Sequence, residues 1–361
     1  MTKLTDLYDV EGQSPWLDNV RRDWLRDGTM ARLIADGVRG VTSNPTIFAK
    51  AIAATSDYDE QLALLGDETP DEAFFKVAGK DIADTAALLA GVHESSKGAD
   101  GFVSFEVPPT LAYDTDGTVA AARQVASTFA LSNLLVKVPA TEQGLGAITA
   151  LISEGTSVNV TLIFGLARYD EVIDAYLAGL ESAAAQGRDL SRISSVASFF
   201  VSRVDTEVDA RLEKLGAPGA LRGRAAVAQA VLAYEQFTRR FASGRFEALQ
   251  AKGARPQRPL WASTSTKNPA YPDLLYVDSL IGPLTVNTMP DGTIKEFEDH
   301  GLVARTIDID VEGARATLAA VKDAGVSIDD VARVLERQGV DSFADSYHQL
   351  VSIIEEKRSD S

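Results

Sequence analysis

One lysine in the sequence lies where a charged side chain is costly. Lys137 interrupts the apolar run Leu134-Leu135-Val136-Lys137-Val138, in which an ammonium group would lose most of its water. Desolvation favours the neutral amine, and a neutral amine can attack a carbonyl carbon to form a Schiff base. A lysine at a sheet edge would instead extend its ammonium group to water. In a closed barrel, which has no edge strand, the nucleophile is the favoured interpretation.

Two carboxylates are candidates for moving protons beside such an amine. A Schiff-base reaction needs a proton donor to expel hydroxide from the carbinolamine and a base for the hydroxyl next to the bond that breaks. Glu106 lies next to the end of the segment GFVSFEV, and Asp18 follows SPWL. Each also has a simpler interpretation, because Glu106 could cap the turn that begins at Val107-Pro108-Pro109 and Asp18 could cap the following helix.

Polar residues end nearly every other apolar run as well. They are Thr42 with Asn44, Asn159 with Thr161, Ser198, Ser265 and Asn287. One such residue is weak evidence, because turns use the same residue types. Asn159 and Thr161 are two apart on a strand and therefore share a face. Two cations, Arg203 after the sixth run and Lys267 in STSTKNP after the seventh, are candidates for binding an anionic group of a substrate.

The elements that must position these residues alternate between two kinds. Short β-branched runs are separated by longer stretches with helical periodicity, and eight runs qualify as strands. The first ends near Asp18, and the others lie near 38–43, 101–107, 134–140, 157–164, 193–200, 258–264 and 282–288. Eight such units favour a single (β/α)8 barrel over an open sheet. The carboxyl ends of barrel strands meet around one mouth, so the polar residues would converge there.

Three stretches exceed the basic barrel pattern within a single domain over 1–361. Ala-rich, periodic stretches near 65–97 and 205–255 predict helical insertions in place of new domains. The stretch near 341–358 has apolar residues at helical spacing behind Asp341 or Ser342 as a cap. We expect a closing helix that packs on the outer helices of the barrel, with a position over the mouth as the alternative.

Composition excludes several classes of partner. The 361 residues include 35 Lys and Arg against 52 Asp and Glu, a net charge of −17, which repels nucleic acid and anionic membranes. There is no Cys, so disulfides and thiolate chemistry are excluded, and the three His residues lack metal-ligand spacing. No apolar run is long enough for a signal or a membrane helix, so a cytoplasmic location is expected.

Five segments occur in an order that resembles a known family. They are GVTSNPTIF, SFEVPPTLAYD, LLVKVPAT, SVNVTLIF and ASFFVSRVD, and each contains a residue already selected on physical grounds. Together they resemble the signatures of transaldolase, and the chain length and the wording WASTSTKNP resemble a longer bacterial branch of that family. The resemblance implies a barrel that transfers a dihydroxyacetone unit in the non-oxidative pentose phosphate pathway. It implies sugar-phosphate substrates, no cofactor and no metal.

The resemblance also implies roles for the selected residues. The donor would be sedoheptulose 7-phosphate or fructose 6-phosphate, and the acceptor glyceraldehyde 3-phosphate or erythrose 4-phosphate. Lys137 would form the Schiff base, Glu106 would act through a water held by Thr161, and Asp18 would be the base at the C4 hydroxyl. The other matched residues would bind substrate: Asn44, Thr42, Asn159 and Ser198 the dihydroxyacetone hydroxyls, and Arg203 and Ser265 the phosphate. Lys267 stands where better-known members have a second Arg.

Other functions are compatible with the same residues. A Schiff-base aldolase would share Lys137 but release free dihydroxyacetone. A metal-dependent barrel could use Lys137 as a proton-abstracting base beside Mg²⁺, although it would want more carboxylates than Asp18 and Glu106. A sugar-phosphate binder without catalysis is a third class. The sequence leaves open whether the chain acts as a monomer or a homodimer.

Overall fold

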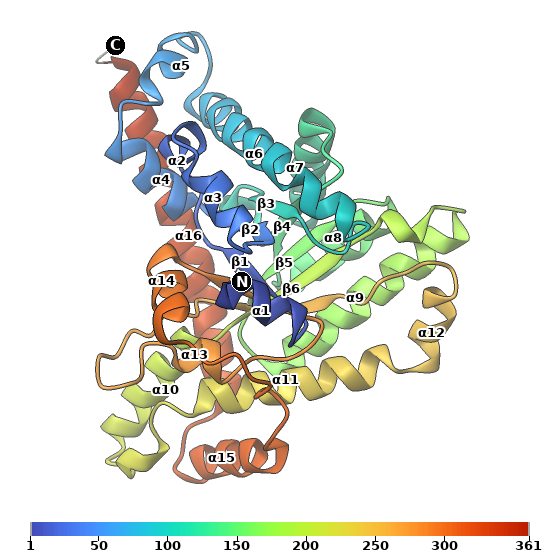
Figure 1. Ribbon diagram of the computed structural model, residues 1–361, viewed down its shortest axis with the longest axis vertical. Coiled ribbons are helices and arrows are strands. Elements are labelled where there is room, and N and C mark those ends of the chain that lie inside the picture. The colour runs from blue at the N-terminus through green and yellow to red at the C-terminus, as the bar shows by residue number, and fades with distance from the viewer. Residues whose placement is uncertain (1, 360–361) are drawn as a thin grey trace.

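Eight parallel strands close into a barrel in the computed structural model, which describes residues 2–359 (Figure 1). Each strand pairs with the next in sequence, and β8 returns to pair with β1. The strands are β1 (Gln13–Leu17), β2 (Gly40–Val41), β3 (Phe102–Glu106), β4 (Leu134–Pro139), β5 (Val158–Ile163), β6 (Ser195–Phe200), β7 (Arg258–Ala262) and β8 (Thr285–Met289). Each overlaps one expected run, and the expected (β/α)8 barrel is confirmed.

Helices surround the barrel and cover its strands. They are α1 (Lys3–Asp9), α2 (Arg22–Arg26), α3 (Thr29–Ala35), α4 (Pro45–Ala54), α5 (Asp59–Ala63), α6 (Pro70–Ser95), α7 (Thr115–Phe129), α8 (Glu142–Ser153), α9 (Leu166–Ala185), α10 (Ser202–Lys214), α11 (Ala225–Phe241), α12 (Gly244–Gln250), α13 (Leu275–Asp278), α14 (Asp291–His300), α15 (Val311–Asp323) and α16 (Ile328–Ser359). The stretch near 65–97 forms α6, and that near 205–255 forms α10 to α12. Within residues 2–359, no helix is long and apolar enough to cross a membrane.

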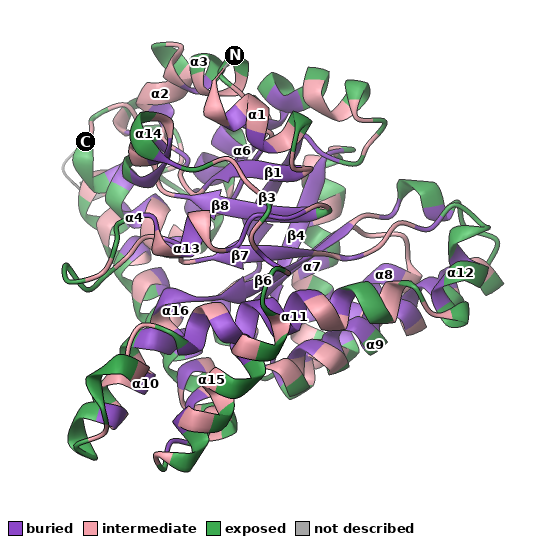
Figure 2. Ribbon diagram, turned by 60° about the horizontal axis from the view of Figure 1, so that its bottom comes forward, coloured by how far each residue is buried: buried purple, intermediate pink, exposed green. Residues whose placement is uncertain are grey.

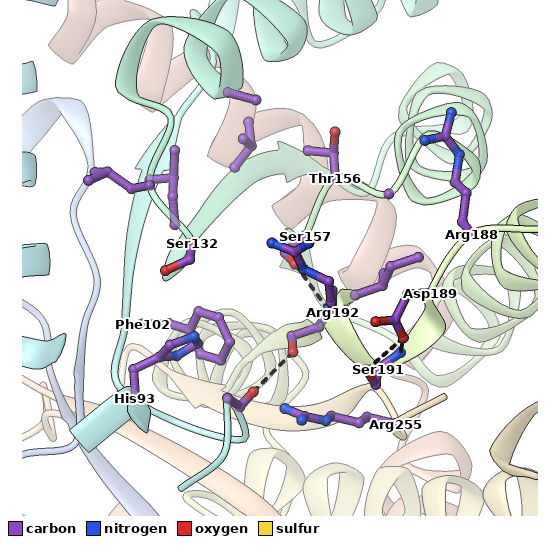
Figure 3. Close-up of a pocket in the computed structure, with 18 of the residues that line it drawn as sticks. His93, Phe102, Ser132, Thr156, Ser157, Arg188, Asp189, Ser191, Arg192 and Arg255 are labelled. Carbon is purple, nitrogen blue, oxygen red and sulfur yellow. Dashed lines mark hydrogen bonds between the residues drawn. The ribbon is translucent and has the colours of Figure 1, made fainter. Parts of the chain in front are cut away.

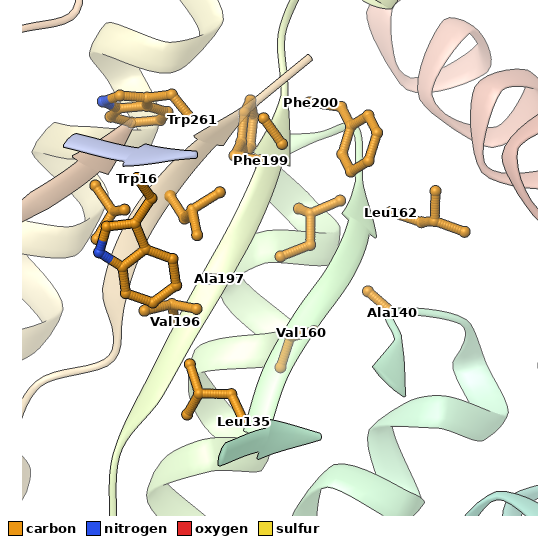
Figure 4. Packing of buried hydrophobic residues seen from close by; sticks show 14 of the residues in the cluster. Trp16, Leu135, Ala140, Val160, Leu162, Val196, Ala197, Phe199, Phe200 and Trp261 are labelled. Carbon is orange, nitrogen blue, oxygen red and sulfur yellow. The ribbon is translucent and has the colours of Figure 1, made fainter. Parts of the chain in front are cut away.

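The core joins the strands to the helix layer. Figure 2 shows the strands buried, with exposed residues on the outer helices, and Figure 4 shows part of the apolar packing. The Phe199 ring of β6 lies edge-on to Trp261 of β7 and to Tyr169 of α9, with centroids 6.2 and 5.9 Å away. Because side chains alternate along a strand, Ser198 and Phe200 point the other way, toward the barrel axis.

Strand β2 is short, and a large ring packs against its first residue. A methyl group at Gly40 would lie 2.4 Å from the indole of Trp16, so only glycine fits at that position. The Trp16 Nε1 atom donates a hydrogen bond to buried Asp100 at 2.8 Å. Asp100 also accepts hydrogen bonds from Arg39 at 2.9 Å and from Arg258 at 3.3 Å. This ionic cluster links the loops that lead into β2, β3 and β7.

The last helix differs from the expectation in where it begins. It was expected near 341–358 behind Asp341 or Ser342, but α16 begins at Ile328. The apolar stripe extends toward the N-terminus through the buried residues Val331 and Leu335. Gly339 interrupts the stripe in the sequence because α16 crosses the end of β5 there, where a methyl group would lie 3.0 Å from the Leu162 side chain.

The position of α16 corresponds to the alternative expectation. It packs against α4, α6 and α10 and reaches the end of β5, so it crosses the mouth of the barrel. Hydrogen bonds attach it to the first part of the chain, among them those from Thr46 to Ser346 at 2.8 Å, from Tyr347 to Asp71 at 2.5 Å and from Lys357 to Asp59 at 2.6 Å. Its C-terminal end lies beside α5 (Figure 1).

Candidate active site

A small cavity of about 130 Å³ opens at the carboxyl ends of the strands. Most of the residues selected from the sequence line it, and they come from both halves of the chain. They are Asp18, Thr42, Asn44, Lys137, Thr161, Ser198, Arg203, Ser265 and Lys267. Glu106 and Asn159 lie behind this wall, beside Lys137 and Ser198. The strand ends therefore bring the selected residues together around one mouth, as the barrel fold requires.

The pairing of β3, β4 and β5 sets the centre of the site. Glu106 is the register partner of Lys137, and Lys137 is the register partner of Asn159, so the three side chains form a row on one face. Lys137 is 5% exposed. Its Nζ atom donates a hydrogen bond to the Ser43 carbonyl oxygen at 2.9 Å and lies 3.6 Å from Glu106 Oε2. The amine is therefore buried among partners that can hold or accept its proton.

Glu106 is a carboxyl group that burial keeps close to neutrality. Desolvation raises the pKa of Glu106 to about 7, and the nearby Lys137 opposes that rise. Its Oε2 atom and the Thr161 hydroxyl are both buried without a hydrogen-bond partner among the described residues. Glu106 can therefore accept and donate protons at neutral pH.

Asp18 follows β1 and lines the same cavity. Its backbone N–H donates to Met289 at 2.8 Å, which extends the pairing of β1 with β8. Thr42 donates a hydrogen bond to Asp18 Oδ1 at 2.7 Å, and the Thr42 hydroxyl also contacts the Thr288 hydroxyl at 2.7 Å. Burial raises the pKa of Asp18, and Lys137 opposes the rise. This is the environment of a base that is fixed in orientation.

Three polar side chains form a hydrogen-bonded chain across the barrel. Ser198 donates to Asn159 Oδ1 at 2.7 Å, and Asn159 Nδ2 donates to the Ser104 hydroxyl at 3.0 Å.

Asn44 caps α4, where its Oδ1 accepts a hydrogen bond from Ile47 N at 3.0 Å. Capping uses only the carbonyl end of Asn44 and leaves its NH₂ group for another acceptor.

A pair of cations lies on the other side of the cavity. Arg203, in the first turn of α10, is half-buried, and burial lowers its pKa. Lys267 donates a hydrogen bond to Ser265, and its pKa is lowered by burial and by the neighbouring Arg203. Neither cation forms an ion pair with a carboxylate among the described residues. Two adjacent unpaired cations in a concave wall favour an anionic group of a ligand.

Sequence reasoning missed some of the lining and misplaced one residue. Thr288, not Asn287, is the β8 residue at the cavity, and Asn287 is buried with its side chain donating to Tyr276 O at 3.3 Å. A shift of one residue along a strand reverses the face, so the error follows from the boundary of β8. Phe200 could have been found by alternation from Ser198. Phe343 of α16, whose ring centroid lies 5.9 Å from Lys137 Nζ, gave no local signal.

Comparison with known proteins identifies the family. The family Transaldolase/Fructose-6-phosphate aldolase matches residues 15–354. A transaldolase of Frankia alni is 52% identical over 349 residues, which cover 95% of this chain and 94% of that protein. A transaldolase of Thermobifida fusca is 52% identical over 354 residues, with 96% of each chain covered. Transaldolase 1 of Streptomyces coelicolor is 51% identical over 350 residues, 95% of this chain and 92% of that protein. The chain belongs to the transaldolase/fructose-6-phosphate aldolase family.

Proposed function

We propose that this chain is a transaldolase, which transfers a dihydroxyacetone unit from a ketose phosphate to an aldose phosphate through a Schiff base on Lys137. One observation carries the proposal. The Lys137 amine is buried 3.6 Å from the Glu106 carboxylate, in a cavity whose far wall holds the unpaired cations Arg203 and Lys267. A nucleophile, a proton carrier and a phosphate site are the parts that this reaction needs.

Schiff-base formation uses the pair of Lys137 and Glu106. Ionised Glu106 takes a proton from the ammonium group, and the free amine attacks the ketone carbon of the donor. The nitrogen then passes a second proton to the former carbonyl oxygen, which becomes the hydroxyl group of the carbinolamine. Protonated Glu106 then donates to that hydroxyl group, which leaves as water, and nitrogen and carbon form the iminium. The pKa of Glu106 near 7 supports transfer in both directions at neutral pH.

Cleavage and transfer use Asp18. The carboxylate takes the proton of the donor's C4 hydroxyl, and the electrons of the C3–C4 bond move to the iminium nitrogen. The aldose phosphate leaves, and an enamine stays on Lys137. The acceptor aldehyde is then attacked by the enamine carbon, and Asp18 returns its proton to the aldehyde oxygen. The hydrogen bond from Thr42 holds the Asp18 carboxylate in one orientation for both half-reactions.

Retention of the enamine distinguishes a transferase from an aldolase. The rings of Phe343 and Phe200 cover the cavity next to Lys137 and reduce the access of water to the enamine. Asn44, Asn159 and Ser198 hold the dihydroxyacetone hydroxyls. An aldolase that releases dihydroxyacetone is the second candidate, and the family name includes such an enzyme. An assay for free dihydroxyacetone without an acceptor separates the two.

The phosphate of either substrate binds to Arg203, Ser265 and Lys267. Arg203 offers a planar fork to two phosphate oxygens, and Lys267 offers a single point charge. The Ser265 hydroxyl is oriented by its hydrogen bond from Lys267. We place the enzyme in the cytoplasm, where sugar phosphates occur. Light scattering distinguishes a monomer from a homodimer.

Trapping the intermediate tests the proposal directly. The protein is incubated with fructose 6-phosphate, reduced with borohydride and digested, and its peptides are weighed. A dihydroxyacetone-derived mass is expected on the peptide containing Lys137. The Lys137→Ala variant should lose the label and all turnover but keep its circular dichroism spectrum, and the control Lys252→Ala, at an exposed lysine, should retain both. Label on another peptide, or no label on the folded protein, would refute the mechanism.

A further inference from the structure

A second and larger cavity, of about 830 Å³, lies at the other end of the barrel (Figure 3). It is bounded by the loops that lead into β3, β4, β5, β6 and β7, so it is at the amino ends of the strands. The residues proposed for catalysis are at the carboxyl ends. A volume in this range is typical of sites for small molecules.

Four cations line this second cavity, although the chain as a whole has a net charge of −17. They are Lys97, Arg188, Arg192 and Arg255. Among the described residues, none of the four forms an ion pair with a carboxylate. In this respect they resemble Arg203 of the active site. Unpaired cations gathered in a concave wall produce a local positive field that attracts small anions.

The carboxylates of the same wall are mostly engaged elsewhere. Glu154 accepts two hydrogen bonds from Arg123, at 2.9 and 2.5 Å. Asp189 accepts from the backbone and the hydroxyl of Ser191, at 3.0 and 2.6 Å. Glu94 is exposed at the rim. The positive charge of the wall therefore exceeds the negative charge that faces it.

Arg255 provides the most specific sign of a missing partner. Its Nη2 atom donates to the Lys97 carbonyl oxygen, whereas its Nη1 atom is buried and has no partner among the described residues. A buried guanidinium N–H without an acceptor is costly. Burial and the nearby Arg258 also lower the pKa of Arg255. An anion in the cavity would lie beside this guanidinium and offset its repulsion by Arg258.

Hydroxyl groups complete the wall. The Ser157 oxygen accepts a hydrogen bond from Ser194 N at 3.0 Å, which leaves its own O–H for another acceptor. Figure 3 shows Ser157, Arg192 and Arg255 among the residues around this cavity. Two guanidinium forks and a hydroxyl around one space are the donors that proteins use for phosphoryl groups.

A structural role accounts for only part of the cluster. The helices α6, α8 and α9 end near this cavity, and cations complement the partial negative charge of helix C-termini. That role explains the bond from Arg255 Nη2 to Lys97 O and the place of Arg188 next to Gly155 after α8. It does not explain the unpartnered Nη1 atom of Arg255 or the place of Arg192 in the wall of the same cavity.

We propose that this cavity is a second anion-binding site, which takes a phosphoryl group as inorganic phosphate or as a phosphomonoester. The proposal does not depend on the transaldolase mechanism, because none of the residues that line this cavity belongs to the catalytic one. Binding at this site neutralises the cations and stabilises the loops that lead into five of the strands.

Calorimetry on the Arg203→Ala protein tests the proposal, since this background weakens phosphate binding at the active site. Titration with inorganic phosphate should show one remaining site. Adding Arg192→Gln should weaken the affinity of this site for phosphate about tenfold or more, which is the usual effect of losing a charged hydrogen bond. The control Arg239→Gln removes the same charge at an exposed helix position and should leave the affinity for phosphate unchanged. Arg255→Gln repeats the test at a second cation of the cavity.

A parallel titration with glycerol phosphate identifies the source of the phosphoryl group. Tighter binding of glycerol phosphate assigns a phosphomonoester, and tighter binding of inorganic phosphate assigns the free ion. The proposal is overturned if the folded Arg203→Ala protein binds neither probe. It is also overturned if Arg192→Gln and Arg255→Gln lower the melting temperature but leave the affinity for both probes unchanged, because the cations would then be structural only.

Discussion

The protonation of Glu106 should control the rate in mildly acidic solution. In the proposed mechanism, ionised Glu106 accepts the proton of Lys137 before the amine attacks, so activity should fall as the carboxylate becomes protonated. Burial raises the pKa of Glu106 to about 7. At pH 5 about 1% of such a group is ionised, against about 75% for a carboxyl with an ordinary pKa of about 4.5. The value of kcat/KM at pH 5 should therefore be about 1% of its plateau.

The assay is the formation of glyceraldehyde 3-phosphate from fructose 6-phosphate and erythrose 4-phosphate. Products are measured by mass spectrometry at timed points, so that no coupling enzyme limits the pH range. The phosphates of the substrates also titrate near pH 6, and the Glu106→Gln variant controls for them. Because Gln cannot accept the proton, we expect the variant to be slower by roughly 10²–10⁴-fold and to lack the acidic limb assigned to Glu106.

Two results would contradict this reasoning. If the wild-type protein kept about three quarters of its plateau at pH 5, Glu106 would be an ordinary solvated carboxyl. If Glu106→Gln showed the same acidic limb as the wild-type protein, the limb would belong to the substrate phosphates or to Asp18. In either case the proton carrier next to Lys137 would be another group.

Three further outcomes are expected. Phe343→Ala should increase the release of free dihydroxyacetone from fructose 6-phosphate several-fold relative to transfer, because water reaches the enamine, and it should lower the free energy of unfolding by about 3–5 kcal/mol. The control Phe343→Leu should keep the cavity covered. Equal release of dihydroxyacetone from the wild-type protein and both variants would remove the role of the ring. Lys267→Arg should lower KM for fructose 6-phosphate with kcat unchanged, because a fork replaces a point charge, and an unchanged KM would place the phosphate elsewhere. Asp100→Ala should lower the free energy of unfolding measured in urea by about 3–5 kcal/mol, because Arg39 and Arg258 lose a buried partner. The control Asp84→Ala, which removes an exposed pair with Lys80, should lower it by less than about 0.5 kcal/mol. A small effect of Asp100→Ala would mean that the cluster adds little to stability.

The barrel and most of the mouth were predictable because their signals are local. A β-branched run that ends in a polar residue marks a strand and the end that faces the mouth, as in LLVKVPAT for β4. Once the fold is a closed parallel barrel, topology alone brings Asp18, Lys137 and Arg203 to one cavity. The order of the strands and the convergence of these residues follow without any knowledge of side-chain packing.

What sequence reasoning missed depends on packing between distant segments. Phe343 lies over Lys137 because α16 crosses the end of β5, and nothing within α16 marks that crossing except Gly339. Asn287 was selected from the sequence in place of Thr288, which lines the cavity, because the end of β8 was placed one residue too early. The cations of the second cavity come from separate loops, so no spacing in the sequence connects them.

The placement of α16 has a consequence for biosynthesis. All eight strands precede this helix in the chain, so the barrel can close on the ribosome before the segment that covers its mouth has been translated. A nascent chain at that stage holds Lys137 without the Phe343 ring, which in the folded protein lies 5.9 Å from its Nζ atom. Hydrogen bonds from Thr46 of α4 to Ser346 and from Tyr347 to Asp71 of α6 then attach this late segment to helices from the first part of the chain. The cover proposed to keep water from the enamine is therefore the part of the site that is translated last among the described residues.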